Sequence, residues 1–175
     1  VGFSTTAVAG ERQRGTLEVV LARPVSRRAL YTTLLVSLLL FLGIVLAASI
    51  VGTAIGSAIA GVLDELPLDR LPILWLNGLL LWGAIGAIGL AASVSFDRLT
   101  PAVGVTIAIV VLMYFLQILG SLWPDAAGLQ RYSLFHYLAA SSVLAGTTDV
   151  AGLAILAVVG AIAIAWALVV FPRRD

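Results

Sequence analysis

Four long intervals without a charged residue constrain what this chain can fold into. They contain 35, 26, 26 and 23 residues and lie between Arg28 and Asp64, Arg70 and Asp97, Arg98 and Asp125, and Asp149 and Arg173. A transmembrane α-helix needs about 20 predominantly apolar residues, so each interval is long enough to cross a bilayer. We therefore predict an all-α, polytopic membrane helix bundle with spans at about 31–59, 73–95, 102–123 and 150–171.

The composition excludes several classes of chemistry. Hydrophobic residues make up 61% of the chain and charged residues 11%, against about 45–50% and 25% in soluble domains. All ten basic residues are arginine, so a phosphate-binding loop with its lysine is ruled out. Without cysteine and with one histidine, His136, a cysteine- or histidine-based metal cluster cannot form. A net charge of +1 gives no basic face for nucleic acid.

A catalytic centre is not expected either. Ser133 and Ser141 lie close to His136 in the sequence, but a serine nucleophile also needs a third group that orients the histidine, and an oxyanion site. Neither is visible, so His136 is predicted to be an interfacial residue. We expect no catalytic, cofactor-binding or metal-binding residues.

The arginines are distributed unequally between the two sides of the predicted bundle. Alternating loops place eight arginines on one side and only Arg70 and Arg131 on the other. Cytoplasmic loops carry the excess of Lys and Arg. We therefore expect residues 10–28 and the C-terminal tail to be cytoplasmic, in a plasma (inner) membrane protein. The uncharged stretch within 133–146 is too short to span and is expected to form an external re-entrant or interfacial helical segment.

Small residues recur on two spans. Gly52, Gly56 and Ala60 follow each other at four-residue steps, and Gly83, Gly86 and Gly89 at three-residue steps. Small faces allow helix backbones to approach closely. Packing within one bundle is the favoured interpretation, and a dimer interface is the alternative.

Residues 10–28 form the longest charged stretch, GERQRGTLEVVLARPVSRR. Gly15 breaks any helix that arrives from residues 1–9, and Thr16 can cap a new one with Glu18 in its first turn. Leu17 and Leu21 would then share one helix face. Physical reasoning leaves two interpretations open, an amphipathic hairpin on anionic lipid or a docking site for a soluble partner.

A family resemblance favours the docking site. The run from Gly10 to Glu18, followed by Arg23-Pro24-Val25-Ser26-Arg27, resembles the G-E-x-x-x-G-T-L-E … P-V-S-R signature of type-2 ABC transporter permeases. A weaker likeness lies at Tyr132–Tyr137, similar to the S-P-F-x-Y stretch before the last span of many members, with Leu134 in place of the proline.

The resemblance implies a permease subunit of an ATP-driven ABC exporter, N-terminally truncated. Residues 1–9 would be the cytoplasmic end of a truncated helix, 10–28 a cytoplasmic coupling helix, and 29–175 the transmembrane domain. ATP and Mg²⁺ would bind to a separate ABC ATPase subunit, and a second permease copy or a homologous permease would complete the substrate pathway in the lipid bilayer. The residues implied in coupling are Glu11, Arg14, Gly15, Thr16, Leu17, Glu18, Leu21, Pro24 and Arg27. A scaffold or assembly factor without transport activity, whose hairpin recruits a soluble partner, is the alternative function.

Overall fold

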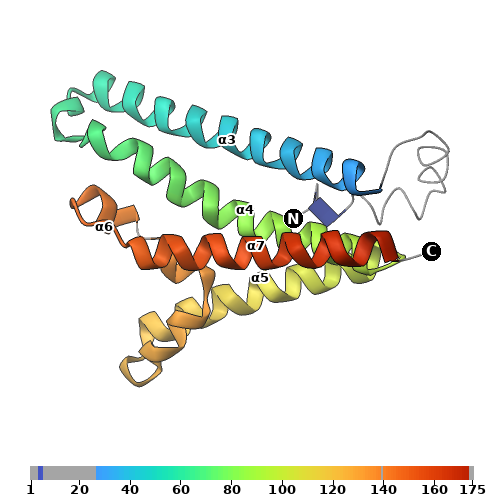
Figure 1. Cartoon of the computed structure of the whole chain (residues 1–175). Coiled ribbons are helices and arrows are strands. Elements are labelled where there is room, and N and C mark those ends of the chain that lie inside the picture. The colour runs from blue at the N-terminus through green and yellow to red at the C-terminus, as the bar shows by residue number, and fades with distance from the viewer. Residues whose placement is uncertain (1–3, 6–26, 139, 174–175) are drawn as a thin grey trace.

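The structure is a computed structural model, and it describes residues 4–5, 27–138 and 140–173. Four long apolar helices dominate it: α3 (Arg27–Ala60), α4 (Leu71–Ser95), α5 (Leu99–Leu122) and α7 (Val150–Arg173) (Figure 1). Each is long and apolar enough to cross a membrane. The described residues contain no strand. The prediction of an all-α polytopic membrane helix bundle is confirmed.

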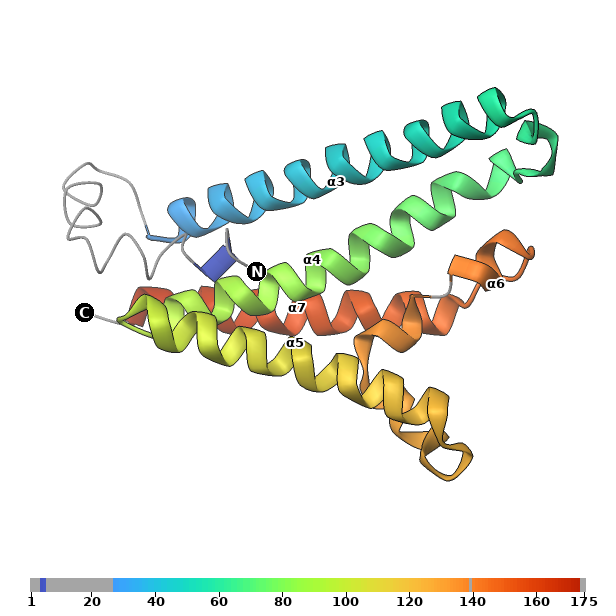
Figure 2. The same cartoon turned by 180° about the vertical axis from the view of Figure 1, so that it is seen from behind.

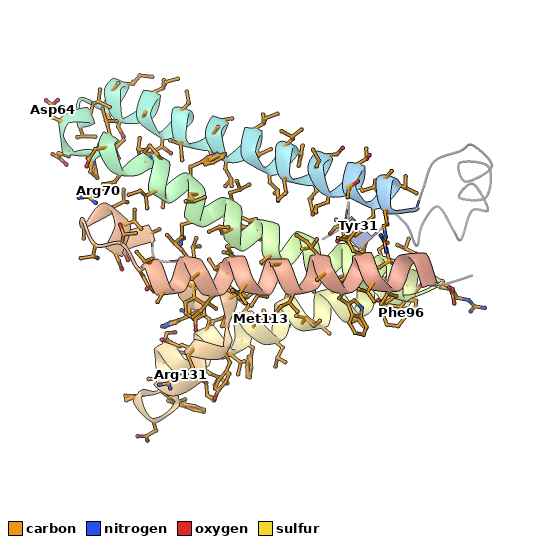
Figure 3. The ribbon with its side chains drawn as sticks, viewed as in Figure 1. Tyr31, Asp64, Arg70, Phe96, Met113 and Arg131 are labelled. Carbon is orange, nitrogen blue, oxygen red and sulfur yellow. The ribbon has the colours of Figure 1, made fainter. Side chains whose placement is uncertain are left out.

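Short helical pieces connect the long helices. Two 3-10 turns, η1 (Leu63–Glu65) and η2 (Leu68–Arg70), lie between α3 and α4. Three pieces lie between α5 and α7, namely η3 (Pro124–Tyr132), η4 (Leu134–Tyr137) and α6 (Ala140–Leu144). The end of the bundle that carries the start of α3 and the end of α4 is called the proximal end here, and the opposite end the distal end. Asp64, Arg70 and Arg131 lie toward the distal end, and Tyr31 and Phe96 toward the proximal end (Figure 3).

Local sequence signals determine where the helices stop. α3 ends at Ala60 and is followed by Gly61, whose φ of +73° is the left-handed conformation common after a helix. The amide of Val62 donates to the Ser57 carbonyl at 3.0 Å, and that of Gly61 to the Ala58 carbonyl at 3.2 Å, which together make a Schellman motif. At the start of α7, Asp149 Oδ1 accepts the Gly152 amide hydrogen at 2.9 Å and acts as an N-cap.

α4 is the central helix of the bundle. It packs against α3, α5 and α7, and both views show it among the other three (Figures 1 and 2). More than half of its most apolar stretch is buried, against less than a fifth for each of the other three long helices. The remaining faces of α3, α5 and α7 are exposed in the described chain and carry apolar side chains, as expected for surfaces that meet lipid or other transmembrane helices.

The glycines of α4 explain its close approach to α3. A Cβ atom on Gly83 would lie 3.2 Å from Leu39 Cδ2, and one on Gly86 would lie 2.6 Å from Leu38 Cδ2. These glycines therefore pack within the bundle, as predicted. Gly52 and Gly56 behave differently, because nothing within 4 Å in the described chain would meet a Cβ added to either. For this stripe, packing within the bundle stays a prediction, as does the alternative of a dimer interface.

Candidate functional site

Eight of the nine residues predicted to act in coupling lie outside the described residues. They are Glu11, Arg14, Gly15, Thr16, Leu17, Glu18, Leu21 and Pro24. The ninth, Arg27, is the first residue of α3. The structure does describe residues on either side of the predicted coupling segment, residues 10–28.

The N-terminal flank, Ser4 and Thr5, contacts the last turns of α4. Both side chains are buried, and Ser93 Oγ donates a hydrogen bond to the Thr5 carbonyl at 2.9 Å. A Cβ added to Gly89 would collide with Ser4 Oγ. Only a glycine at position 89 leaves room for this contact.

The C-terminal flank contacts the same part of α4. Tyr31, in the first turns of α3, is fully buried in a cluster with Leu90 and Val94 of α4 and Ala167 of α7. Its hydroxyl has no hydrogen-bond partner in the described part of the chain. Residues 4–5 and Tyr31 thus both contact the span 89–94 of α4, and we call this set of contacts the proximal junction.

At the distal end, part of the connection between α5 and α7 enters the bundle. We call residues 133–137 the inserted turn. Ser133 starts it, since its Oγ accepts the Phe135 amide hydrogen at 3.2 Å. Leu134 is buried in a cluster with Leu81 and Ile85 of α4 and Leu156 of α7. Leu81 is ten residues from the start of α4, about 15 Å along the helix at 1.5 Å per residue, so the inserted turn reaches well inside the bundle.

Aromatic contacts and one hydrogen bond hold the inserted turn in place. The Phe135 ring makes edge contacts with Trp82 of α4 and Tyr114 of α5, with centroid separations of 6.3 Å and 5.8 Å. Asn77 Nδ2 of α4 donates to the Tyr137 carbonyl at 3.0 Å. Asn77 is buried, and its Oδ1 has no partner in the described part of the chain. Burying a polar side chain among apolar helices costs free energy, and this hydrogen bond satisfies one of the two N–H groups of the amide.

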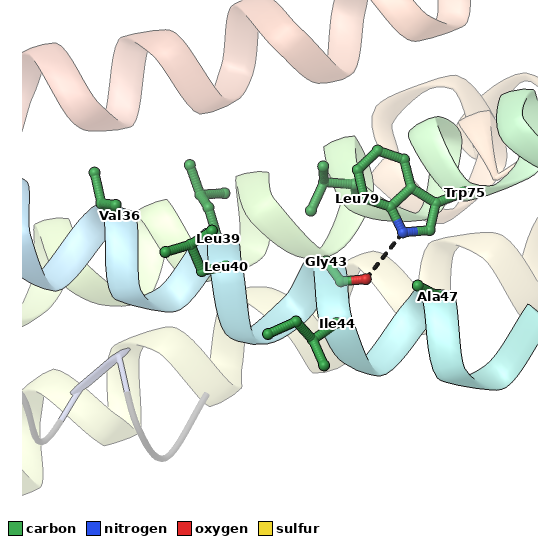
Figure 4. Close-up of a pocket in the computed structure, with 8 residues that line it drawn as sticks. All are labelled: Val36, Leu39, Leu40, Gly43, Ile44, Ala47, Trp75 and Leu79. Carbon is green, nitrogen blue, oxygen red and sulfur yellow. Dashed lines mark hydrogen bonds between the residues drawn. The ribbon is translucent and has the colours of Figure 1, made fainter.

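An apolar groove of about 500 Å³ runs between α3 and α4. Figure 4 shows its lining, which is Val36, Leu39, Leu40, Gly43, Ile44, Ala47, Trp75 and Leu79. Trp75 Nε1 donates to the Gly43 carbonyl at 3.0 Å, so its indole joins α3 to the start of α4. The groove offers dispersion contacts and contains no ionisable side chain.

The ionisable side chains of the described residues lie mostly apart from the groove and the inserted turn. These residues contain no group of three His, Cys, Asp or Glu side chains that could hold a metal ion. The ring of His136 makes an edge contact with that of Tyr137, at a centroid separation of 5.2 Å. Asp69 and Arg70 form an ion pair at 3.1 Å at the distal end.

Sequence reasoning missed the roles of Tyr31, Asn77 and Leu134. Asn77 gave the clearest signal, because an amide inside an uncharged span must find a hydrogen-bond partner. Leu134 and Phe135 gave a weaker one, an apolar pair directly after a possible capping serine. Nothing in the sequence alone places Tyr31 against α4.

Three membrane-length helices packed on a central fourth, α4, with an inserted turn at one end, define a polytopic membrane protein. The chain matches the model of the ABC-2 family transporter proteins over residues 1–175 and belongs to that family. It is therefore a membrane permease component of an ABC transporter, a system that in general includes an ATPase partner. No curated protein and no solved structure matches the chain.

Proposed function

We propose that this chain forms the substrate pathway of an ATP-driven exporter and that residues 10–28 couple it to a separate ATPase subunit. The family supports the permease role. The observation that carries the coupling role is the proximal junction, because both flanks of the coupling segment contact one short stretch of the central helix. A segment that only anchored the protein to lipid would need no such attachment.

The proposal includes an orientation. The proximal end faces the cytoplasm and the distal end the outside of the plasma membrane, as the arginine asymmetry indicates. Glu65 and Arg98 are exposed near opposite ends of α4 and can each be replaced by cysteine in this cysteine-free chain. In intact cells, an impermeant maleimide should label Glu65→Cys and leave Arg98→Cys unlabelled. The reverse result would invert the topology.

Two copies of the permease, or this chain and a homologous permease, would enclose the pathway. The apolar faces that the described helices leave exposed support an assembly of this kind. Cross-linking of the full-length protein in membranes should then give a product of two permease chains. Cross-links to ATPase chains alone would contradict this arrangement.

Glu11→Ala and Leu17→Asp test the coupling role. Leu17 is expected to fill a groove on the ATPase as a helix-in-groove anchor, and Glu11 to form a charge pair. Losing one partner of a desolvated interfacial pair costs about 2–5 kcal/mol, whereas an exposed pair contributes about 0–1 kcal/mol. Both variants should insert normally and copurify with less ATPase.

Gln13→Ala is the matched control, since Gln13 lies in the same segment at a position that the signature leaves free. It should copurify with the ATPase as the wild type does. Normal copurification and ATPase activity in both Glu11→Ala and Leu17→Asp would refute the coupling role and favour the alternative of a scaffold or a lipid anchor.

A further inference from the structure

α4 contacts the flanks of the coupling segment and the inserted turn at two separate places. The proximal junction involves Gly89 and Ser93, and the distal contact involves Asn77 and Leu81. Asn77 and Ser93 are sixteen residues apart, which is about 24 Å along a helix. The helix between them is continuous, and its one proline, Pro72, lies in the first turn, outside that stretch.

The hydrogen bond of the distal contact is sensitive to a small displacement of α4. One described side-chain hydrogen bond, from Asn77 Nδ2 to the Tyr137 carbonyl, joins α4 to the inserted turn, and its length is 3.0 Å. Hydrogen bonds of this kind are lost beyond about 3.5 Å, so a shift of α4 by about 1 Å is enough to release it. Only the apolar and ring contacts of Leu134 and Phe135 would then hold the inserted turn against α4.

We propose that α4 transmits movement of the coupling segment to the inserted turn. In this mechanism Gly89 and Ser93 are positioning residues that connect α4 to residues 4–5, and Asn77 is the positioning residue that holds the inserted turn. Binding of nucleotide by the ATPase moves the two flanks, α4 moves with them, and the inserted turn changes its position at the distal end. The inference rests on the proposed coupling to an ATPase.

The test measures the inserted turn while the ATPase changes state. Leu138, next to Tyr137, is exposed and can carry a single cysteine as reporter. The full-length permease with Leu138→Cys is reconstituted with its ATPase in lipid nanodiscs, which leave both membrane faces accessible, and the rate of labelling by a maleimide is measured with and without a non-hydrolysable ATP analogue. We expect the two rates to differ about fivefold, the size of a modest coupling between two sites.

Two glycine variants separate transmission through α4 from a general loss of packing. Gly89→Val adds atoms where Ser4 Oγ lies, whereas Gly104→Val adds them on α5 where nothing lies within 4 Å in the described chain. Gly89→Val should make the two labelling rates equal while copurification with the ATPase is retained. Gly104→Val should keep the fivefold difference. A nucleotide response in Gly89→Val equal to that of the reporter alone would overturn the inference.

A variant at the other end of α4 keeps the test decisive if Gly89→Val does not fold. Asn77→Leu removes the hydrogen bond to Tyr137 and should give fast labelling in both nucleotide states. Slow, nucleotide-dependent labelling in this variant would overturn the inference. Loss of ATPase copurification in the reporter protein itself would refute the proposed function. If the reporter protein copurifies normally with the ATPase but its labelling rate does not depend on nucleotide, transmission through α4 is refuted and the proposed function is not.

Discussion

Among the glycines at which α3 and α4 face each other, Gly86 leaves the least room for a side chain, and Gly86→Val should push the two helices apart. A Cβ atom there would lie 2.6 Å from Leu38 Cδ2, whereas carbon atoms in ordinary contact are about 3.5–4.0 Å apart. The Leu38 side chain would have to move by about 1 Å. It is only 5% exposed and belongs to the cluster that contains Tyr31 and Leu90, so free space for that movement is lacking.

The expected loss of stability for Gly86→Val is about 1–3 kcal/mol, the usual cost of overpacking a close-packed site. Valine has a somewhat higher helix propensity than glycine, which offsets a few tenths of a kcal/mol. The measurement is unfolding of the chain in mixed micelles as the fraction of sodium dodecyl sulfate rises. Gly52→Val is the control, because nothing within 4 Å in the described chain surrounds position 52.

A double variant identifies the contact responsible. Leu38→Ala removes the side chain that a residue at position 86 would meet, so Leu38→Ala with Gly86→Val should lose less stability than the sum of the two single losses. Neighbouring residues that share a contact typically show an interaction energy of about 0.5–3 kcal/mol. If Gly86→Val were as stable as Gly52→Val, or if the two losses were additive, the packing of α3 on α4 described above would be wrong.

Three further variants can be measured in the same unfolding assay. Leu134→Ala should lose about 2–5 kcal/mol, since Leu134 is buried between α4 and α7, and unchanged stability would mean that the inserted turn lies outside the bundle. Asp149→Ala should lose about 0.5–2 kcal/mol with the N-cap of α7, whereas Asp125→Ala, in a short surface turn, should change little. Tyr31→Phe should leave stability unchanged or raise it, because the buried hydroxyl has no described partner. Tyr31→Ala also removes the ring and should lower the free energy of unfolding by about 3–5 kcal/mol. Equal losses in the two variants would contradict the burial of Tyr31.

The spans were predictable because hydrocarbon thickness fixes a minimum length for an uncharged helix. The ends were less predictable, since charges mark where the apolar interval stops and not where the helix stops. α3 begins at Arg27 and includes two arginines, whereas the predicted span begins at residue 31. α4 ends at Ser95 and α7 begins at Val150, which are the residues where the predicted spans end and begin.

Packing partners could not be read from the same patterns. Gly52 and Gly86 both belong to stripes of small residues, yet one is in open space within the described chain and the other contacts Leu38. The difference depends on which helix lies opposite, and a single sequence does not carry that information. The depth of the inserted turn could not be predicted for the same reason, because the burial of Leu134 depends on Leu81 and Leu156 in other helices.

The coupling residues illustrate a different limit. Glu11 and Leu17 were assigned through a signature and not through a contact, and the physics of residues 10–28 fits a lipid-bound hairpin equally well. They stay a prediction until the copurification experiment is done. The structure adds the two flanks, Thr5 and Tyr31, which the signature does not include.

The length of α3 has a consequence for the membrane itself. α3 has 34 residues and the other long helices 24 or 25, so α3 is about 51 Å long where the hydrocarbon layer is about 30 Å thick. Even a tilt of 40°, the upper end of what transmembrane helices adopt, leaves about 39 Å along the bilayer normal. Its last turns, which include the strongly exposed Ile59, would therefore sit in the head-group layer of an average bilayer. Lipids with longer acyl chains would cover these turns, and the protein is expected to favour thick membrane regions and to thicken the lipid layer around α3.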